Sequence, residues 1–104
     1  WKGDLMLTHR LKEARTRAGL SQERLGILAG IDEATASPRM NQYERGTHAP
    51  DFSLACKFAE VLNVPACYFY TVEDDLAELM LILWSTSEQK RTDVIAYAKN
   101  NIAK

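Results

Sequence analysis

The sequence predicts an all-α fold, and two observations lead to this prediction. Apolar side chains recur at steps of three and four residues along most of the chain, which is the period of an amphipathic helix. No stretch shows the sustained apolar-polar alternation that is typical of a half-buried strand. With 104 residues, 46% of them hydrophobic and 26% charged, the composition is that of an ordinary globular chain.

The first helix is expected over residues 5–18, and Gly19 ends it because glycine tolerates the left-handed conformation. Its apolar stripe consists of Leu7, Leu11, Ala14 and Ala18. Ser21 is the expected cap of the second helix, and Gly30 stops that helix. The inward residues of the second helix are Leu25, Leu28 and Ala29.

A polar turn is expected over residues 31–36, with Ile31 buried and with Asp32 and Glu33 in solvent. The pair Ser37-Pro38 then predicts a helix start, because serine caps a helix and proline suits the first helical position. Helical extension back through Pro38 is not expected, since an interior proline costs about 3 kcal/mol. The inward residues of this third helix are Met40 and Tyr43, and Gly46 ends it.

A fourth helix follows the cap residue Asp51 and stops at Asn63, before Pro65. Its apolar stripe consists of Leu54, Ala55, Phe58, Ala59 and Leu62. A short fifth helix is expected over residues 65–70, where Tyr68 and Phe69 close the core.

The last third of the chain predicts two more helices. The segment over residues 74–84 reads DDLAELMLILW and is apolar nearly all round, although one helix on a small domain needs only one apolar stripe. Ser87 caps a final helix to about residue 100, with Val94, Ile95 and Ala98 on one face. We expect residues 1–72 to form one domain and residues 73–104 to form a helical extension.

The second and third helices resemble a helix-turn-helix, which places one short helix in a DNA major groove. If Met40 and Tyr43 of the third helix point inward, the opposite arc carries Pro38, Asn41, Gln42 and Arg45. Glutamine and asparagine can bond adenine through two atoms, and arginine can do so with guanine. The alternative is a polar face that only meets solvent.

The chain resembles the lambda-repressor-like family, which includes Cro, phage repressors and XRE regulators. The matching segments read RLKEARTRAGLSQERLGILAGI, MNQYERGTHAPD and LACKFAEVLNV, and together they cover roughly residues 7–70. The resemblance implies a five-helix DNA-binding domain, here followed by two additional C-terminal helices. It also implies a transcriptional regulator, most simply a repressor, that binds double-stranded DNA.

The resemblance assigns roles to individual positions. It gives Ser37, Pro38 and Gln42 base-facing positions, with Arg45 just beyond. The DNA backbone would be contacted by Gln22 in the second helix and by Thr47 and His48 after the third. An Arg four residues before Gly19 pairs in the family with the Glu of the ERG motif, which here implies a structural ion pair between Arg15 and Glu44.

One departure from the family pattern lies between Gly30 and the ERG motif, where the family has about four fewer residues. The extra residues fall within 32–37, and they lengthen the turn or add a helical turn before Pro38. The longer turn could place Thr35 or Arg39 against the DNA backbone.

Pairing of two chains is expected, because a two-fold dimer reads a near-palindromic DNA site. The candidate contact residues are Leu79, Met80, Leu83 and Trp84. The alternative is that the last helix folds back over the helix before it. The apolar C-terminal helices also fit a second hypothesis, an antitoxin-like module that neutralises a protein partner as well as binding DNA.

Other functions are disfavoured. Residues 1–50 carry eight Lys and Arg against six Asp and Glu, whereas residues 51–87 carry one against six. The basic side chains therefore lie in the part of the chain with the expected helix-turn-helix. On charge alone, a mixed solvated surface is an equally good explanation. No catalytic set, phosphate loop or metal-ligand spacing is present, so no enzyme, cofactor or metal is expected. Cys56 and Cys67 are expected to be buried reduced thiols rather than a disulfide. The chain is expected to be cytoplasmic, with no membrane-spanning segment.

Overall fold

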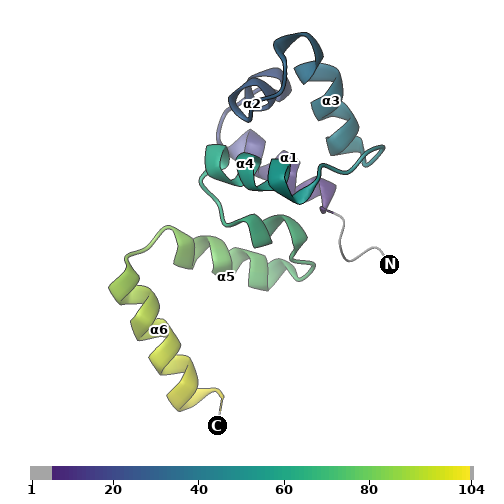
Figure 1. Cartoon of the computed structure of the whole chain (residues 1–104). Coiled ribbons are helices and arrows are strands. Elements are labelled where there is room, and N and C mark those ends of the chain that lie inside the picture. Colours follow the sequence, from purple (N-terminus) through teal and green to yellow (C-terminus); the bar gives the residue numbers. More distant parts are fainter. Residues whose placement is uncertain (1–5, 104) are drawn as a thin grey trace.

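The computed structural model of the chain describes residues 6–103, which form six α-helices and one 3₁₀ helix and contain no strand. The elements are α1 (Thr8–Arg17), α2 (Gln22–Leu28), α3 (Glu33–Arg45), α4 (Phe52–Leu62), η1 (Ala66–Tyr70), α5 (Asp74–Trp84) and α6 (Glu88–Asn101). Helices α1 to α4 are grouped together, α5 runs beneath them, and α6 leads away (Figure 1). The predicted all-α fold of five helices followed by two more is confirmed.

One hydrophobic core joins the first five helices. Leu11 of α1, Phe58 of α4 and Phe69 of η1 are fully buried in it. The ring of Tyr43 from α3 meets the ring of Phe58 edge-on, with 6.1 Å between the centroids. The expected burial of Ile31, Met40, Tyr43, Tyr68 and Phe69 is confirmed.

Three helices are capped by the side chains that the sequence predicts. The Ser21 hydroxyl accepts a hydrogen bond from the Arg24 N–H at 3.0 Å, and the Asp51 carboxylate accepts one from the Leu54 N–H at 2.8 Å. The Ser87 hydroxyl does the same for the Lys90 N–H at the start of α6. Gly46 ends α3 in the left-handed conformation, with φ of 77°.

The first two helices differ from the prediction in detail. Helix α1 begins at Thr8, whereas the expected start at Leu5 lies outside the described residues. The expected burial of Ala18 is wrong, because Ala18 is the exposed cap residue after the last turn. Leu28 is also exposed, since it lies at the end of α2 and at the edge of the stripe that Leu25 and Ala29 define.

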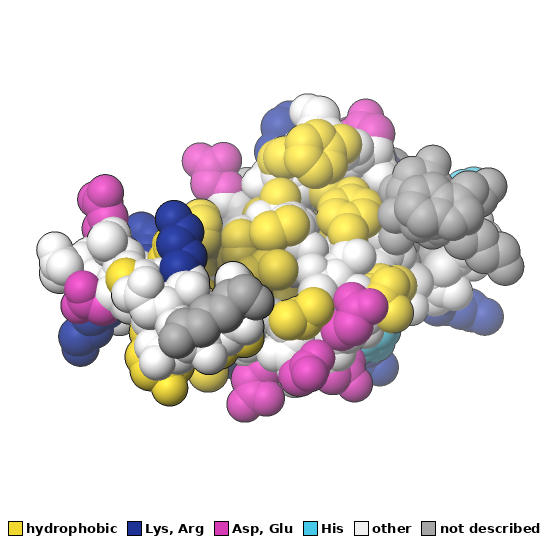
Figure 2. Space-filling view, turned by 90° about the horizontal axis from the view of Figure 1, so that it is seen from below, with side chains coloured by type: hydrophobic (Ala, Val, Ile, Leu, Met, Phe, Trp, Pro, Cys, Tyr) yellow, Lys and Arg dark blue, Asp and Glu magenta, His cyan; other side chains and the backbone are white. Residues whose placement is uncertain are grey.

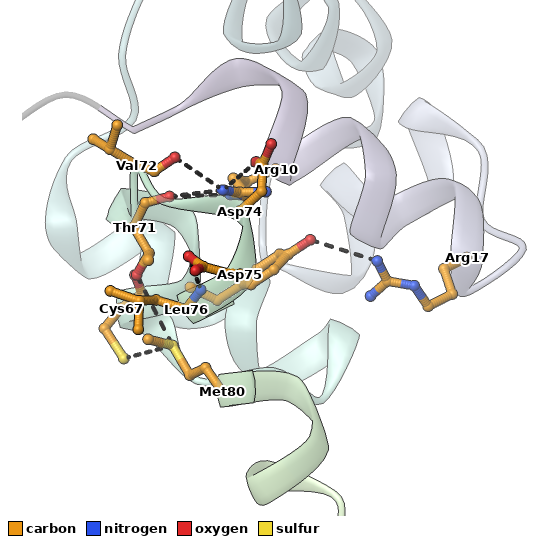
Figure 3. Close-up of polar contacts among 10 residues, drawn as sticks. Arg10, Arg17, Cys67, Thr71, Val72, Asp74, Asp75, Leu76 and Met80 are labelled. Atoms are coloured by element: carbon orange, nitrogen blue, oxygen red, sulfur yellow. Dashed lines mark hydrogen bonds and ion pairs between the residues drawn. The ribbon is translucent and has the colours of Figure 1, made fainter. Parts of the chain in front are cut away.

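A buried arginine connects α1 to the start of α5. The Arg10 guanidinium donates to the Thr71 carbonyl oxygen at 2.9 Å and 3.1 Å, and to the Val72 carbonyl oxygen at 3.3 Å (Figure 3). It also pairs with the Asp74 carboxylate at 2.9 Å and lies over the Tyr68 ring. These contacts fix the chain between η1 and α5 against α1.

The two C-terminal helices bury little. Ala77 is the fully buried residue of α5, and no residue of α6 is buried. The alternative in which the last helix folds back over α5 is therefore wrong, because such packing would bury an apolar face of α6. Between residues 6 and 103, the structure holds no helix that could cross a membrane.

The two cysteines are free, as expected. The expected burial of both is wrong, because Cys56 is half-buried and Cys67 is exposed. Cys67 lies beside α5, and its Sγ is 3.3 Å from the Met80 Sδ (Figure 3).

Candidate nucleic-acid interface

Helix α3 is one turn longer than the sequence predicts. It begins at Glu33, and the Asp32 carboxylate accepts a hydrogen bond from the Ala34 N–H at 3.4 Å. The predicted turn over residues 31–36 is therefore wrong, because residues 33–36 form the first turn of the helix. Ser37 is not the cap residue, and Pro38 lies inside the helix.

Packing against α2 explains why the extra turn forms. Ala36 is fully buried on the same side of α3 as Met40 and Tyr43, so the added turn extends the apolar stripe. Gly26 of α2 makes room for it, since a Cβ on Gly26 would lie 3.0 Å from the Ala36 Cβ. The expectation that Pro38 prevents this extension is wrong, because burial and capping offset the loss of one intrahelical donor.

The face of α3 that points away from α2 is polar and exposed. At about 100° per residue, Pro38, Gln42 and Arg45 follow one line, and Asn41 lies beside them. The added turn brings Thr35 onto the same line. These five side chains are exposed over about 15 Å of helix. The structure therefore brings four of the five expected base-reading residues together on one face, with Thr35 at its start, and leaves Ser37 outside it.

Ser37 and Arg39 lie on opposite flanks of this face. The Arg39 guanidinium donates to the Tyr43 hydroxyl at 2.7 Å and lies 5.7 Å from the centre of that ring. Arg39 was expected to contact the DNA backbone, and here its charge lies at the edge of α3, turned toward its own helix. Ser37 is exposed on the other flank.

The ERG motif joins α3 to α1 and α2 through its glutamate. The Arg15 guanidinium donates to both Glu44 carboxylate oxygens, at 2.5 Å and 3.0 Å, and to the Leu20 carbonyl oxygen at 2.8 Å. The Gln22 amide donates to Glu44 at 3.2 Å. The Glu44 side chain is only 4% exposed, so its carboxylate has lost most of its hydration. The hydrogen bonds from Arg15 and Gln22 offset that desolvation cost.

The loop after α3 stays close to the helix end. The N–H groups of Thr47 and His48 both donate to the Gln42 carbonyl oxygen, at 3.0 Å and 3.4 Å. Both side chains are exposed. The loop therefore continues the polar surface at the C-terminal end of α3.

The four expected dimer residues point in two directions. Met80 and Trp84 face the chain's own domain, where Met80 contacts Cys67 and the Trp84 indole N–H donates to the Asn63 side chain at 3.3 Å. Leu79 and Leu83 lie toward the opposite side of α5, and Leu79 is exposed.

Three residues that organise the site were not identified from the sequence. Gly26 sets the distance between α2 and α3, Asp32 caps α3, and Arg10 fixes the start of α5. The signal for Asp32 was present, because an Asp followed by a Glu is typical of a helix start. Nothing local distinguishes Gly26 or Arg10, since their partners are distant in the sequence.

This arrangement, two packed helices with an exposed polar face on the second, is that of a helix-turn-helix. Residues 7–67 match the family described as a helix-turn-helix domain. The chain belongs to this family. Within residues 6–103, no group of three or more metal-ligating side chains is placed to hold an ion.

The relatives of this helix-turn-helix protein are named as regulators. It is 33% identical over 67 residues to uncharacterized HTH-type transcriptional regulators of Sinorhizobium medicae (strain WSM419) and Rhizobium meliloti (strain 1021). That match covers 64% of this chain and 45% of each relative, so it spans less than half of their length. The crystal structure of the transcriptional regulator BswR matches with a TM-score of 0.89 and 46% identity, over 94% of this chain and 97% of that one.

Proposed function

We propose that this protein binds double-stranded DNA through the outward face of α3 and regulates transcription. The observation that carries the proposal is the line of exposed side chains formed by Thr35, Pro38, Gln42 and Arg45. An α-helix fits the major groove, and amide and guanidinium groups there bond base edges. Family membership and the names of the relatives support the same function.

The proposal divides the contacts into two groups. Asn41, Gln42 and Arg45 read base edges, and Ser37 and Pro38 approach bases at the other end of the face. Gln22, Thr35, Arg39, Thr47 and His48 approach the DNA backbone around them. The Arg15–Glu44 pair touches no DNA and fixes α3 to the other two helices.

We further propose that the protein is a repressor and acts as a homodimer. A protein that occupies a promoter site excludes polymerase from it, which is the simplest consequence of binding alone. Two copies related by a two-fold axis would place their α3 helices about 34 Å apart on a near-palindromic site. The exposed apolar residues of α5 supply a surface for pairing.

Selection from a randomised DNA duplex library tests this function and supplies the probe. We expect an inverted repeat to be enriched. On that probe, Gln42→Ala and Arg45→Ala should each lose about 1–3 kcal/mol of discrimination at particular bases. Gln22→Ala should weaken binding to all sequences alike, because phosphate contacts carry no sequence information.

Asn100→Ala is the matched control, since Asn100 is an exposed polar residue on α6, far from α3 in the chain. It should leave the sequence preference unchanged. If no sequence is enriched, or if Gln42→Ala and Arg45→Ala lose affinity equally on every sequence, α3 does not read bases.

A further inference from the structure

Helix α6 has an apolar face that none of residues 6–103 covers. Val94, Ile95 and Ile102 are 40%, 52% and 74% exposed, and they lie with Ala98 on one side of the helix. No residue of this 14-residue helix is buried. Isolated helices of this length are marginally stable in water, so α6 requires a surface that covers its apolar face.

Helix α5 has a second apolar face, directed away from its own domain. Ala77, Met80 and Leu81 pack inward. Leu76, Leu79 and Ile82 lie on the other side and are 51%, 46% and 56% exposed. Figure 2 looks at the molecule from the side of α5 and α6, and it shows hydrophobic side chains gathered across this face with acidic side chains along one edge.

The outward face of α5 carries acidic side chains, and the apolar face of α6 carries mainly basic ones. Glu78 lies at the edge of the outward face of α5, next to Ile82, and Asp75 lies at the start of that face, in line with Leu79 and Ile82. On α6, Arg91 lies in line with Val94, Ile95 and Ala98. Lys90 and Lys99 lie on the two sides of that face, and Glu88 lies beside it at the N-terminal end of the helix. A pairing of α5 with α6 therefore combines apolar burial with charge complementarity, whereas α5 against α5 would bring carboxylates together.

We propose that α6 of each copy packs across the outward face of α5 of a second copy. The exchange is reciprocal, so one two-fold dimer covers both apolar faces of both chains. The proposal rests on the homodimer of the proposed function and specifies which surfaces form it. The dimer contact does not depend on which DNA sequence the protein binds.

The fold favours a second copy as the occupant. Only Ser85, Thr86 and Ser87 connect the two helices, and α6 leads away from α5 instead of lying along it (Figure 1). The two faces occur in equal number on every chain, so two copies leave neither exposed. Helix α6 is also long enough to cover α5, because its 14 residues span about 21 Å and the 11 residues of α5 span about 16 Å.

Cross-linking between two differently tagged copies tests the exchange. In a chain with Cys56→Ala and Cys67→Ala, one copy carries Leu79→Cys and the other carries Ile95→Cys. The mixture is equilibrated and treated with a short bismaleimide. We expect the mixed dimer to be the main cross-linked product, and neither copy alone to give a comparable yield.

Other cross-linking patterns would overturn the proposal. A product from the Leu79→Cys copy alone would show α5 against α5, and one from the Ile95→Cys copy alone would show α6 against α6. A chain with both substitutions that cross-links only within itself would show that α6 folds back. Phe52→Cys replaces Leu79→Cys as the control, because Phe52 is 64% exposed on α4, and it should give no mixed dimer.

Light scattering on the unmodified full chain gives an independent measurement. We expect twice the mass of one chain, reduced to one chain by Ile82→Ser or Ile95→Ser and unchanged by Phe52→Ser. A monomer at micromolar concentration would overturn the exchange. Binding of an unrelated protein by that monomer would not rescue it, because the proposed occupant of both faces is a second copy. A monomer that still selected one DNA sequence would leave the DNA-binding proposal intact, and a cross-linked mixed dimer that selected none would contradict only DNA binding.

Discussion

Gly26 of α2 and Ala36 of α3 are packed so closely that a Cβ added to Gly26 would lie 3.0 Å from the Ala36 Cβ. The same Cβ would lie 3.0 Å from the Met40 Cγ. Contacts this short require a neighbour to move, and the Ala36 Cβ can move only with its backbone. The distance between the two helices of the motif is therefore set by the absence of a side chain at one position.

We expect Gly26→Ala to lower the free energy of unfolding by about 1 kcal/mol. Overpacking costs about 1–3 kcal/mol, and the better helix propensity of alanine recovers about 1 kcal/mol of it. Denaturant unfolding measures the change. Adding Ala36→Gly returns the space, so the double variant should be more stable than the two single losses predict. A stabilisation by Gly26→Ala alone would show that the two helices separate freely.

The start of α3 at Glu33 predicts different effects for two residues that could each cap a helix. Asp32→Ala should cost about 1 kcal/mol, because Asp32 caps the Ala34 N–H. Ser37→Ala should change stability by less than about 0.5 kcal/mol, because Ser37 is an exposed residue inside the helix. Thermal unfolding of the two variants measures both losses. If α3 began at Ser37 instead of Glu33, Ser37→Ala would cost more stability than Asp32→Ala.

The Arg15–Glu44 pair should be necessary for a stable α3. Arg15→Met should cost about 3 kcal/mol, because it leaves the buried Glu44 carboxylate without its cation. DNA affinity should fall with it on every sequence. Lys12→Met is the matched control in the same helix, since Lys12 is exposed, and it should have little effect. The double variant Arg15→Met with Glu44→Met should recover much of the lost stability, because no unpaired charge is then buried. If it recovers none, the loss in Arg15→Met does not come from the unpaired Glu44 carboxylate.

The buried Arg10 should matter far more than its acidic partner. Arg10→Met leaves the Thr71 and Val72 carbonyl groups without a donor, so we expect a loss of about 1–3 kcal/mol. Asp74→Asn should cost less than about 1 kcal/mol, because the Asp74 side chain is 89% exposed. Urea unfolding compares the two. Equal losses would mean that the ion pair, and not the carbonyl contacts, fixes the start of α5.

Local sequence patterns predicted the helix starts correctly where a segment carried one such pattern and no competing one. The caps Ser21, Asp51 and Ser87 precede clear apolar stripes, and each caps its helix in the structure. The expected position of Arg15 opposite Glu44 also holds in the geometry. This came from the family resemblance, because 29 residues separate the two partners and no local pattern joins them.

The sequence was insufficient where two local patterns competed. Asp32-Glu33 and Ser37-Pro38 are both typical helix starts, and the contact of Ala36 with Gly26 decides between them. The surplus of apolar residues in α5 was visible, but its division into an inward and an outward face depends on where the rest of the domain lies. Arg10 was missed for the same reason, since its partners are more than 60 residues away.

The position of Pro38 has one more consequence for the exposed face of α3. A proline has no N–H, so the carbonyl oxygen of Ala34, four residues earlier, has no donor from that position. Ala34 is exposed, and water can hydrate this oxygen in the free protein. A ligand that covers α3 must supply a donor to the same oxygen, keep its water, or lose about 1–3 kcal/mol of binding free energy. The main chain of α3 therefore contributes to what the protein accepts there, and no side-chain change at Ala34 can remove that contribution.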